Sequence, residues 1–287
     1  ARNQLVLDFS RKEVRDSIFN NIAKVLDQGH VSYVKWDMNR SVADVYSLEH
    51  VPGKVRYEYV AGVYAFLKAL TERYPELIIE GCSGGGGRFD AGMLHYEPQI
   101  WASDNSDACD RVMIQYGLSY FYPSSTVGAH VSAVPNHQTG RITPLSTRGI
   151  TAMAGTFGYE LDPAKLTKEE RDEIRTQIRD YKRFESLVRE GDYYRLSDPF
   201  TDGISAWAFV SPDRCTALLS YVCLENHGNM DVKYIRAAGL DPEQRYAVEA
   251  EGNILSGAAL MEAGLPVLPP LMDYKAGQIL LKAVGET

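Results

Sequence analysis

Apolar residues in the first 165 positions follow two patterns that alternate along the chain. Short continuous apolar runs are followed by longer stretches in which apolar residues recur every three to four positions, the spacing of one helical face. The runs predict strands at residues 5–9, 31–36, 77–80, 99–102, 126–131 and 158–161, and the spaced stretches predict helices at residues 11–26, 54–73, 110–122 and 147–157. Strands that alternate with helices form a parallel sheet covered by helices, which is the α/β class.

Two α/β folds fit this alternation, a (β/α)8 TIM barrel and an open, doubly wound sheet. Both build their chemistry at the carboxyl ends of the strands, so strand ends alone do not separate them. A barrel uses about 30 residues for each strand–helix unit, so the region up to residue 165 corresponds to about five and a half units. If the chain is a barrel, it therefore lacks its first strands.

The pattern changes after residue 166. Residues 167–189 predict one highly charged helix. Beyond it, short strands separated by Gly, Asp and Asn turns are predicted at residues 206–210, 216–222, 234–238, 246–248 and 278–284. These strands predict a small antiparallel β-domain, expected to be a sandwich. We therefore predict two domains, residues 1–197 for the partial barrel and residues 198–287 for the β-domain.

Composition narrows the class of function. The chain has 287 residues, 45% of them hydrophobic, and a formal net charge of −8. An acidic chain without long charge runs argues against partners that are nucleic acids or anionic membranes. No apolar stretch approaches the ~18–20 residues of a membrane span. The chain opens without a methionine or an apolar leader and is expected to be an excerpt of a longer protein.

The four cysteines fit no metal-binding spacing, so neither a zinc site nor another metal site is expected. Cys215 and Cys223 lie eight positions apart on one predicted strand, roughly 26 Å at ~3.3 Å per residue, too far for a disulfide. Reduced thiols in a cytoplasmic protein are the expectation.

Carboxylates follow two of the predicted strands, each beside a tryptophan. Asp37 ends the strand in the stretch YVKWDMNR, while Asp104 and Asp107 lie in WASDNSD. Two carboxylates near aromatic rings are what glycoside hydrolysis requires. Lys35 lies two residues before Asp37, on the same face of the strand, where an ammonium would keep a nucleophilic carboxylate ionised. Alternatively, Asp37 is only a strand-end cap paired with Lys35 or Arg40, and this pattern does not choose between Asp104 and Asp107.

A glycine-rich segment, GCSGGGGR at residues 81–88, follows the strand at 77–80. Its first five residues match G-x-S-x-G, so a serine esterase with Ser83 as nucleophile is a rival hypothesis. That motif must run directly into a helix, where each glycine costs ~1 kcal/mol. No dinucleotide or P-loop motif can be laid on the segment. A loop whose backbone approaches a bound sugar suits it as well, and a plain turn is the remaining alternative.

Two histidines, His130 and His137, lie in GAHVSAVPNHQTGR with no carboxylate or cysteine at ligand spacing. They are expected to shape a rim or a contact between subunits rather than to bind metal.

Taken together, KWDMNR, CSGGGGRFD, WASDNSD, HVSAVPNHQTGR and GTFGYELD closely resemble bacterial α-galactosidases of glycoside hydrolase family 36. The resemblance implies a retaining, exo-acting hydrolase of terminal α-linked galactose, as in melibiose and raffinose. It implies that Asp37 is the nucleophile, Asp107 the acid/base and Asp104 a supporting residue. The residues it implies as sugar contacts are Arg2, Lys35, Trp36, Asn39, Cys82, Ser83, Gly84 and Gly85.

The resemblance also carries expectations about the whole protein. In the family the nucleophile follows the fourth barrel strand, so residues 5–9 would be the third, and two strands and a large β-domain would precede this chain. Activity of the isolated chain then depends on that N-terminal half as a partner. The resemblance implies a homo-oligomer, a tetramer in many members, and no cofactor. The alternatives within the family are an α-N-acetylgalactosaminidase and a galactosyl transferase; outside it they are the esterase and an inactive sugar-binding fragment.

Overall fold

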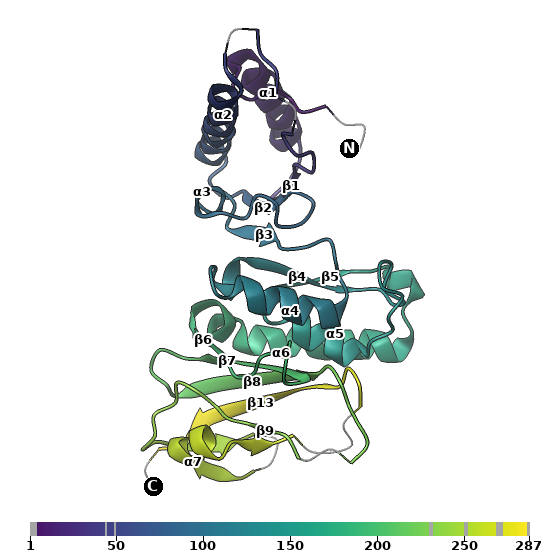
Figure 1. The fold of residues 1–287 in the computed structure, drawn as a ribbon, viewed down its shortest axis with the longest axis vertical. Coiled ribbons are helices and arrows are strands. Elements are labelled where there is room, and N and C mark those ends of the chain that lie inside the picture. Colours follow the sequence, from purple (N-terminus) through teal and green to yellow (C-terminus); the bar gives the residue numbers. More distant parts are fainter. Residues whose placement is uncertain are drawn as a thin grey trace. The chain divides into compact units, whose positions relative to one another are not determined.

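The computed structural model describes residues 5–43, 45–48, 50–229, 232–249, 252–267 and 272–285. The chain forms two compact units, residues 1–104 and residues 105–287 (Figure 1). Arg2, one of the predicted sugar contacts, lies outside the described residues.

Unit 1 holds three parallel strands and the helices between them. The strands are β1 (Tyr33–Asp37), β2 (Ile78–Cys82) and β3 (Gln99–Trp101), and the helices are α1 (Lys12–Gln28), α2 (Pro52–Arg73) and α3 (Ala91–Leu94). β2 pairs with β1 on one side and with β3 on the other. The carboxyl ends of the three strands therefore lie at one edge of the sheet.

The core of unit 1 lies between these strands and helices α1 and α2. Val63, Phe66, Leu67 and Leu70 of α2 are buried there together with Ile79 of β2. Their spacing of three to four positions puts the apolar face of α2 on the sheet, as the sequence pattern predicts. This packing fixes β1 and β2, and hence the residues that follow them.

Unit 2 begins with helices and two more parallel strands. They are α4 (Ala108–Leu118), β4 (Val127–Ser132), α5 (Leu145–Ala152), β5 (Thr156–Glu160) and α6 (Lys168–Glu190), with short 3₁₀ turns at Ser124–Thr126 and Pro163–Lys165. β4 and β5 pair in parallel, with His130 opposite Gly158. A capping box between Thr167 and Glu170 starts α6, because each side chain satisfies a backbone N–H of the other's residue.

A six-stranded antiparallel sheet follows, in the order β11-β10-β13-β8-β7-β6. Its strands are β6 (Asp192–Arg195), β7 (Ile204–Val210), β8 (Thr216–Cys223), β10 (Arg245–Val248), β11 (Ile254–Ser256) and β13 (Ala276–Ala283). A two-stranded ribbon of β9 (Tyr234–Ile235) and β12 (Leu265–Pro266), with helix α7 (Gly257–Glu262), completes the unit. In Figure 1, α4, α5 and α6 lie between the β4–β5 pair and this sheet.

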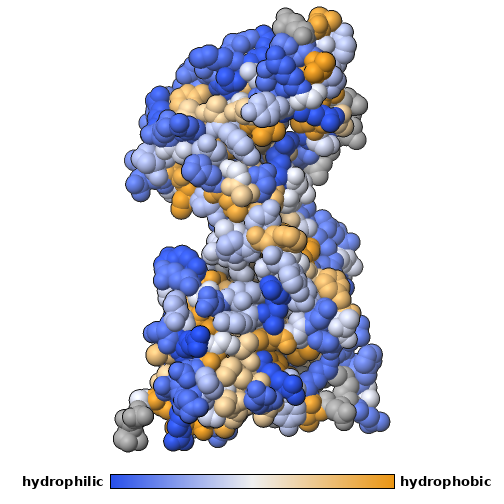
Figure 2. Space-filling view, turned by 60° about the vertical axis from the view of Figure 1, so that its left-hand side comes forward, coloured by the Kyte–Doolittle hydropathy of each residue, from blue (hydrophilic) through white to orange (hydrophobic). Residues whose placement is uncertain are grey.

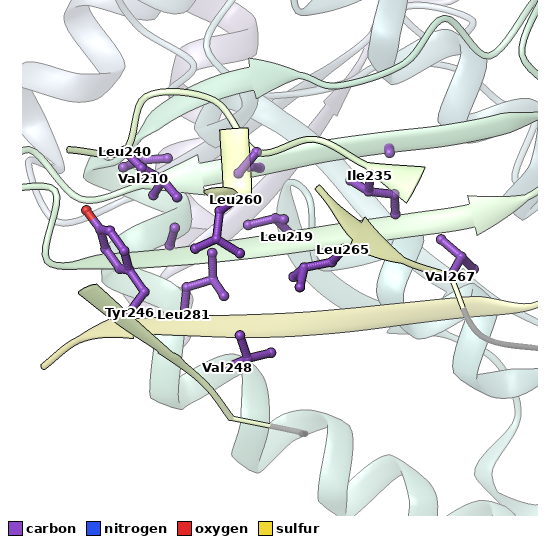
Figure 3. Packing of buried hydrophobic residues seen from close by; sticks show 14 of the residues in the cluster. Val210, Leu219, Ile235, Leu240, Tyr246, Val248, Leu260, Leu265, Val267 and Leu281 are labelled. Carbon is purple, nitrogen blue, oxygen red and sulfur yellow. The ribbon is translucent and has the colours of Figure 1, made fainter. Parts of the chain in front are cut away.

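Both faces of the six-stranded sheet are buried. In β7 all seven residues are buried; Ala208 and Val210 join one core, and Trp207 and Phe209 join another. Figure 3 shows the first core, where Leu260 of α7 and Leu265 of β12 pack over the sheet. The second core contains Phe184 and Leu187 of α6. Burial on both sides explains why this strand is a continuous apolar run rather than an alternating one.

The structure confirms the alternation of strands and helices up to residue 161 and the antiparallel region after it. Most of the predicted elements begin and end within four residues of the observed ones.

The strand predicted at residues 5–9 is wrong. Residues 5–8 form no regular element, and Leu5 is 97% exposed. A strand requires a hydrogen-bonded neighbour, and none of the described strands pairs with this segment. The domain boundary between residues 197 and 198 stays a prediction. Strand β6, which belongs to the six-stranded sheet, lies before that boundary.

Figure 2 shows hydrophilic residues over most of the visible face of the molecule, with small apolar patches between them. In the part of the chain that the structure describes, no helix is both long and apolar enough to cross a membrane.

Candidate active site

Asp37 lies at the carboxyl end of β1, on the same face as Lys35. The residues of β1 alternate between exposed and half-buried, so Lys35 and Asp37 face one way and Trp36 faces the other. In the parallel register, Lys35 lies opposite Glu80 and Asp37 opposite Cys82. Asp37 is exposed, and its Oδ2 accepts a hydrogen bond from Asn39 Nδ2 at 2.6 Å. Among the described residues, the side-chain partners of Asp37 are thus Asn39 and the Cys82 thiol, rather than Lys35 or Arg40.

The segment after β1 is tied to the loop after β2. The backbone N–H of Gly84 donates to Asn39 Oδ1 at 2.6 Å, and Ser83 Oγ donates to the carbonyl oxygen of Met38 at 3.0 Å. Asn39 therefore uses its amide nitrogen on Asp37 and its amide oxygen on the loop. Burial raises the pKa of the Cys82 thiol to about 11, with a smaller contribution in the same direction from Asp37. Cys82 is consequently a neutral thiol beside the Asp37 carboxylate.

The glycine loop is a tightly fitted element, not a plain flexible turn. Gly84 and Gly85 have φ values of 59° and 82°, a region that side chains with a Cβ rarely adopt. A Cβ on Gly85 would lie 2.6 Å from Ser103 Cα and 3.1 Å from Asp104 N. Glycine at this position therefore allows the loop to lie against the segment that follows β3.

We predict that Gly85→Ala is more damaging than Gly84→Ala. Both positions have positive φ, so both variants carry backbone strain. A Cβ at Gly84 meets no atom of the described residues within 4 Å, so only Gly85→Ala adds steric overlap. Overpacking of this kind costs about 1–3 kcal/mol. The difference should appear in the free energies of unfolding from urea titrations of the two variants. Equal losses would contradict the close contact between the loop and Ser103.

Lys35 is held by a buried carboxylate that the sequence pattern did not single out. Its Nζ lies 3.3 Å from Glu80 Oε1 and 4.7 Å from the centre of the Trp101 ring. Glu80 is fully buried, and its Oε2 also accepts hydrogen bonds from Tyr33 and Gln99. Burial, followed by Glu80, raises the pKa of Tyr33. A charged residue closing the apolar run Leu-Ile-Ile-Glu was the available signal, since buried charges need partners.

Trp36 packs beneath β1. Its ring stacks on Phe66 of α2, with centroids 5.2 Å apart and an interplanar angle of 28°. A hollow of about 380 Å³ at the end of β1 is lined by Trp36, Asp37 and the apolar segment at residues 5–7, among others. The main contact of the indole is with the protein core, because strand alternation turns it away from Lys35. A sugar contact of Trp36 stays a prediction.

The two carboxylates after β3 have different environments. Asp104 is exposed and follows β3 in unit 1, next to the tip of the glycine loop. Asp107 is 2% exposed and caps α4 in unit 2: its Oδ1 accepts from the backbone N–H groups of Cys109 at 2.9 Å and Asp110 at 3.1 Å. The same oxygen is ion-paired with Arg141.

The role of Asp107 as the acid/base stays a prediction. The second oxygen of Asp107, Oδ2, accepts a hydrogen bond from Thr139 Oγ1 at 2.7 Å, so both oxygens are engaged inside the protein. An acid/base must reach the leaving oxygen of its substrate within about 2.6–3.2 Å. To act on a substrate, Asp107 would exchange one of these partners for the leaving oxygen of the sugar. Asp104 is an exposed residue.

Ser83 does not have the geometry of an esterase nucleophile. The next helix, α3, begins at Ala91, so the loop does not run into a helix as the elbow motif requires. The Ser83 hydroxyl instead donates to the carbonyl oxygen of Met38.

The two histidines of the sequence prediction lie in unit 2. His130 Nδ1 lies 3.5 Å from Glu160 Oε2, and His137 is exposed. Among the described residues no group of three His, Cys, Asp or Glu side chains could hold a metal ion.

Two family models match the chain. "Melibiase" matches residues 1–191, and "Glycosyl hydrolase family 36 C-terminal domain" matches residues 204–281. The two regions together include most of both compact units.

Curated relatives match along the whole chain. A bifunctional alpha-galactosidase/sucrose kinase of Mediterraneibacter gnavus, AgaSK, is 59% identical over 100% of this chain and 30% of the relative. Alpha-galactosidase AgaA of Geobacillus stearothermophilus is 47% identical over 100% of this chain and 40% of the relative. The chain thus spans well under half the length of these relatives.

Solved structures agree with this likeness. The galactosidase domain of AgaSK has a TM-score of 0.96 and 59% identity over 99% of this chain and 39% of that one. A variant of AgaA, in complex with raffinose, has a TM-score of 0.95 and 46% identity over 99% of this chain and 40% of that one. The predicted fold class, part of a parallel α/β barrel followed by an antiparallel β-domain, is confirmed. With a family model over residues 1–191 and relatives this similar along its whole length, the chain belongs to the melibiase family, glycosyl hydrolase family 36.

Proposed function

We propose that this chain carries the catalytic carboxylates of an α-galactosidase that hydrolyses terminal α-linked galactose. The observation that supports this most is Asp37: an exposed carboxylate at the end of a parallel strand, oriented by Asn39 at 2.6 Å, in a chain of this family. Relatives named alpha-galactosidases, and structures of one of them with raffinose and stachyose, support galactosides as the substrate class.

In this proposal the reaction is a double displacement with retention. Asp37 attacks the anomeric carbon, and a galactosyl ester on Asp37 is then hydrolysed by water. Asn39 donates a hydrogen bond to Oδ2 of Asp37. The other oxygen, Oδ1, then attacks the anomeric carbon, unless the two oxygens exchange these roles. Lys35, fixed by Glu80 on the same face of β1, offers its ammonium to a sugar hydroxyl. The backbone of the loop at Cys82, Ser83, Gly84 and Gly85 approaches the sugar from β2.

We propose Asp107 as the acid/base, as the family resemblance implies, and Asp104 as a supporting residue. The AgaA variants in complex with raffinose and with stachyose are each substituted at one aspartate, and these two aspartates lie 70 positions apart in AgaA, as Asp37 and Asp107 do in this chain. Asp104 follows β3 at the same sheet edge as Asp37, and the glycine loop that contacts Asn39 also contacts the backbone of Asp104. Retaining enzymes place their two carboxyl groups about 5–5.5 Å apart. Asp107 also has a structural task, because it caps the start of α4 and is paired with Arg141.

Exo action on melibiose and raffinose, a cytoplasmic location, a homo-tetramer and a requirement for further polypeptide stay predictions. Nothing in the described residues favours α-N-acetylgalactosamine substrates or galactosyl transfer over hydrolysis.

The test is hydrolysis of p-nitrophenyl α-galactoside by two proteins. One is the 287-residue chain alone, and the other is a chimera in which this chain replaces the matching segment of AgaA. We expect the chimera to release nitrophenol, and we expect Asp37→Gly to abolish this activity. The ratio of the two hydrolysis rates measures how active the 287-residue chain is by itself. A folded chimera that cleaves only α-N-acetylgalactosaminides or p-nitrophenyl esters would contradict the proposal.

A further inference from the structure

Three buried polar atoms in unit 1 belong to residues that line one small cavity beside the glycine loop. Trp36 Nε1, Arg88 Nε and Glu97 Oε1 are all shielded from solvent, and none has a hydrogen-bond partner among the described residues. All three residues line the same cavity, of about 10 Å³. Buried polar atoms are almost always hydrogen-bonded, so three unpaired atoms around one cavity point to a bound guest.

The size and chemistry of the cavity fit a single water molecule. A water requires roughly 10–15 Å³ of probe-sized space and two to four polar partners. Trp36 and Arg88 each offer an N–H donor, and Glu97 offers an acceptor oxygen. Met93 and Ile100 close the cavity with apolar surface, which leaves no room for a larger ligand.

The cavity joins segments that reach the candidate active site. Trp36 directly precedes Asp37 on β1, and Arg88 ends the glycine loop, where its Nη2 donates to the carbonyl oxygen of Arg40 at 3.3 Å. Glu97 is 1% exposed, and its carboxyl group fills the space that a Cβ at Gly81 would need. The end of β1, the loop after β2 and the segment before β3 therefore meet at this point.

We propose that the cavity is an internal water site, in which one water accepts from Trp36 and Arg88, donates to Glu97, and so fixes the end of β1 against the loop after β2. The site does not depend on the proposed α-galactosidase activity, because neither the atoms nor the tests below involve a substrate. It makes Glu97 a positioning residue for the strand that carries Asp37.

The charge of Glu97 gives this site a measurable signature. Burial, followed by the nearby Asp90, raises the pKa of Glu97 to about 8, while Arg88 acts in the opposite direction. The other titratable groups that face it are Tyr64, whose pKa burial raises, and Cys82 across the cavity, whose pKa is about 11. Glu97 is thus expected to become charged near pH 8, across one water from the Trp36 indole.

Tryptophan emission tests this coupling. We expect the wild-type emission to change with a midpoint near pH 8, and the change to disappear in Glu97→Gln and in Trp36→Phe. Glu76→Gln, which alters an exposed glutamate of the same unit, should keep it. A transition that survives in Glu97→Gln would overturn the link between Glu97 and Trp36.

A crystal structure of the wild-type chain tests the water itself. We expect one peak of density within about 3 Å of Trp36 Nε1, Arg88 Nε and Glu97 Oε1, the usual hydrogen-bond length. A cavity without density, or one closed by a direct bond between Arg88 and Glu97, would overturn the proposal even if the emission change is observed.

Discussion

Asp37→Gly is expected to lower kcat for p-nitrophenyl α-galactoside by about 10⁴-fold or more, the order seen when a nucleophile is removed from other hydrolases. The variant leaves no carboxylate to form the covalent intermediate, and Asn39 loses its partner at 2.6 Å. Because the Asp37 side chain is exposed, the variant should keep the wild-type urea unfolding midpoint, which serves as the control for folding. The measurement is initial-rate hydrolysis by the chimera with AgaA.

Azide identifies the role of the missing carboxylate. If Asp37 is the nucleophile, azide can enter the space that the Asp37→Gly substitution opens and attack from the same side, so the product is β-galactosyl azide. Recovery of the α-azide would mean that Asp37 is instead the acid/base. No recovery, together with an unchanged unfolding midpoint and unchanged galactose binding, would count against both roles.

Most of the fold of unit 1 could be predicted because its strands are short apolar runs between helices with clear periodicity. The exception is the segment at residues 5–9, whose apolar run is as strong as that of β1. A strand is stabilised by pairing with a neighbouring strand as well as by its own residues. The sequence of one segment does not show whether a neighbouring strand is available to pair with it. The segment at 192–195 shows the converse. Its sequence DYYR has no apolar run, yet it forms β6, with Tyr193 packed on Phe209 of β7 at 5.3 Å.

The candidate site was partly predictable. Alternation along a strand is enough to put Lys35 and Asp37 on one face. Glu80 and Glu97 were not predictable as partners, because their contacts arise from strand register and from packing between β2, β3 and α3. For Asp107 a signal was present: aspartate directly before a helical stretch is a preferred N-cap. A capping role does not exclude a catalytic one, so the choice of Asp107 as the acid/base, which comes from the family resemblance, stays a prediction.

Asp107→Ala is expected to destabilise unit 2 strongly. The variant leaves Arg141 without its buried partner and uncaps α4, and breaking one side of a buried ion pair costs about 3–5 kcal/mol. Arg141 keeps its contact with Asp110 at 3.2 Å, which places the loss toward the lower end of that range. Asp107→Asn keeps an oxygen for the N-cap and should lose less. Urea unfolding of the three proteins measures the order.

Asp104→Ala is the matched variant and is expected to behave in the opposite way. Because the Asp104 side chain is exposed, its loss should leave the unfolding free energy within about 0.5 kcal/mol of wild type. Hydrolysis by Asp104→Ala should fall about equally for galactosides with good and with poor leaving groups. Folded Asp107→Asn should instead lose most activity on raffinose and least on p-nitrophenyl α-galactoside, because only poor leaving groups need a proton. If Asp104→Ala shows that leaving-group dependence and Asp107→Asn does not, the roles of the two residues are reversed and Asp104 is the acid/base.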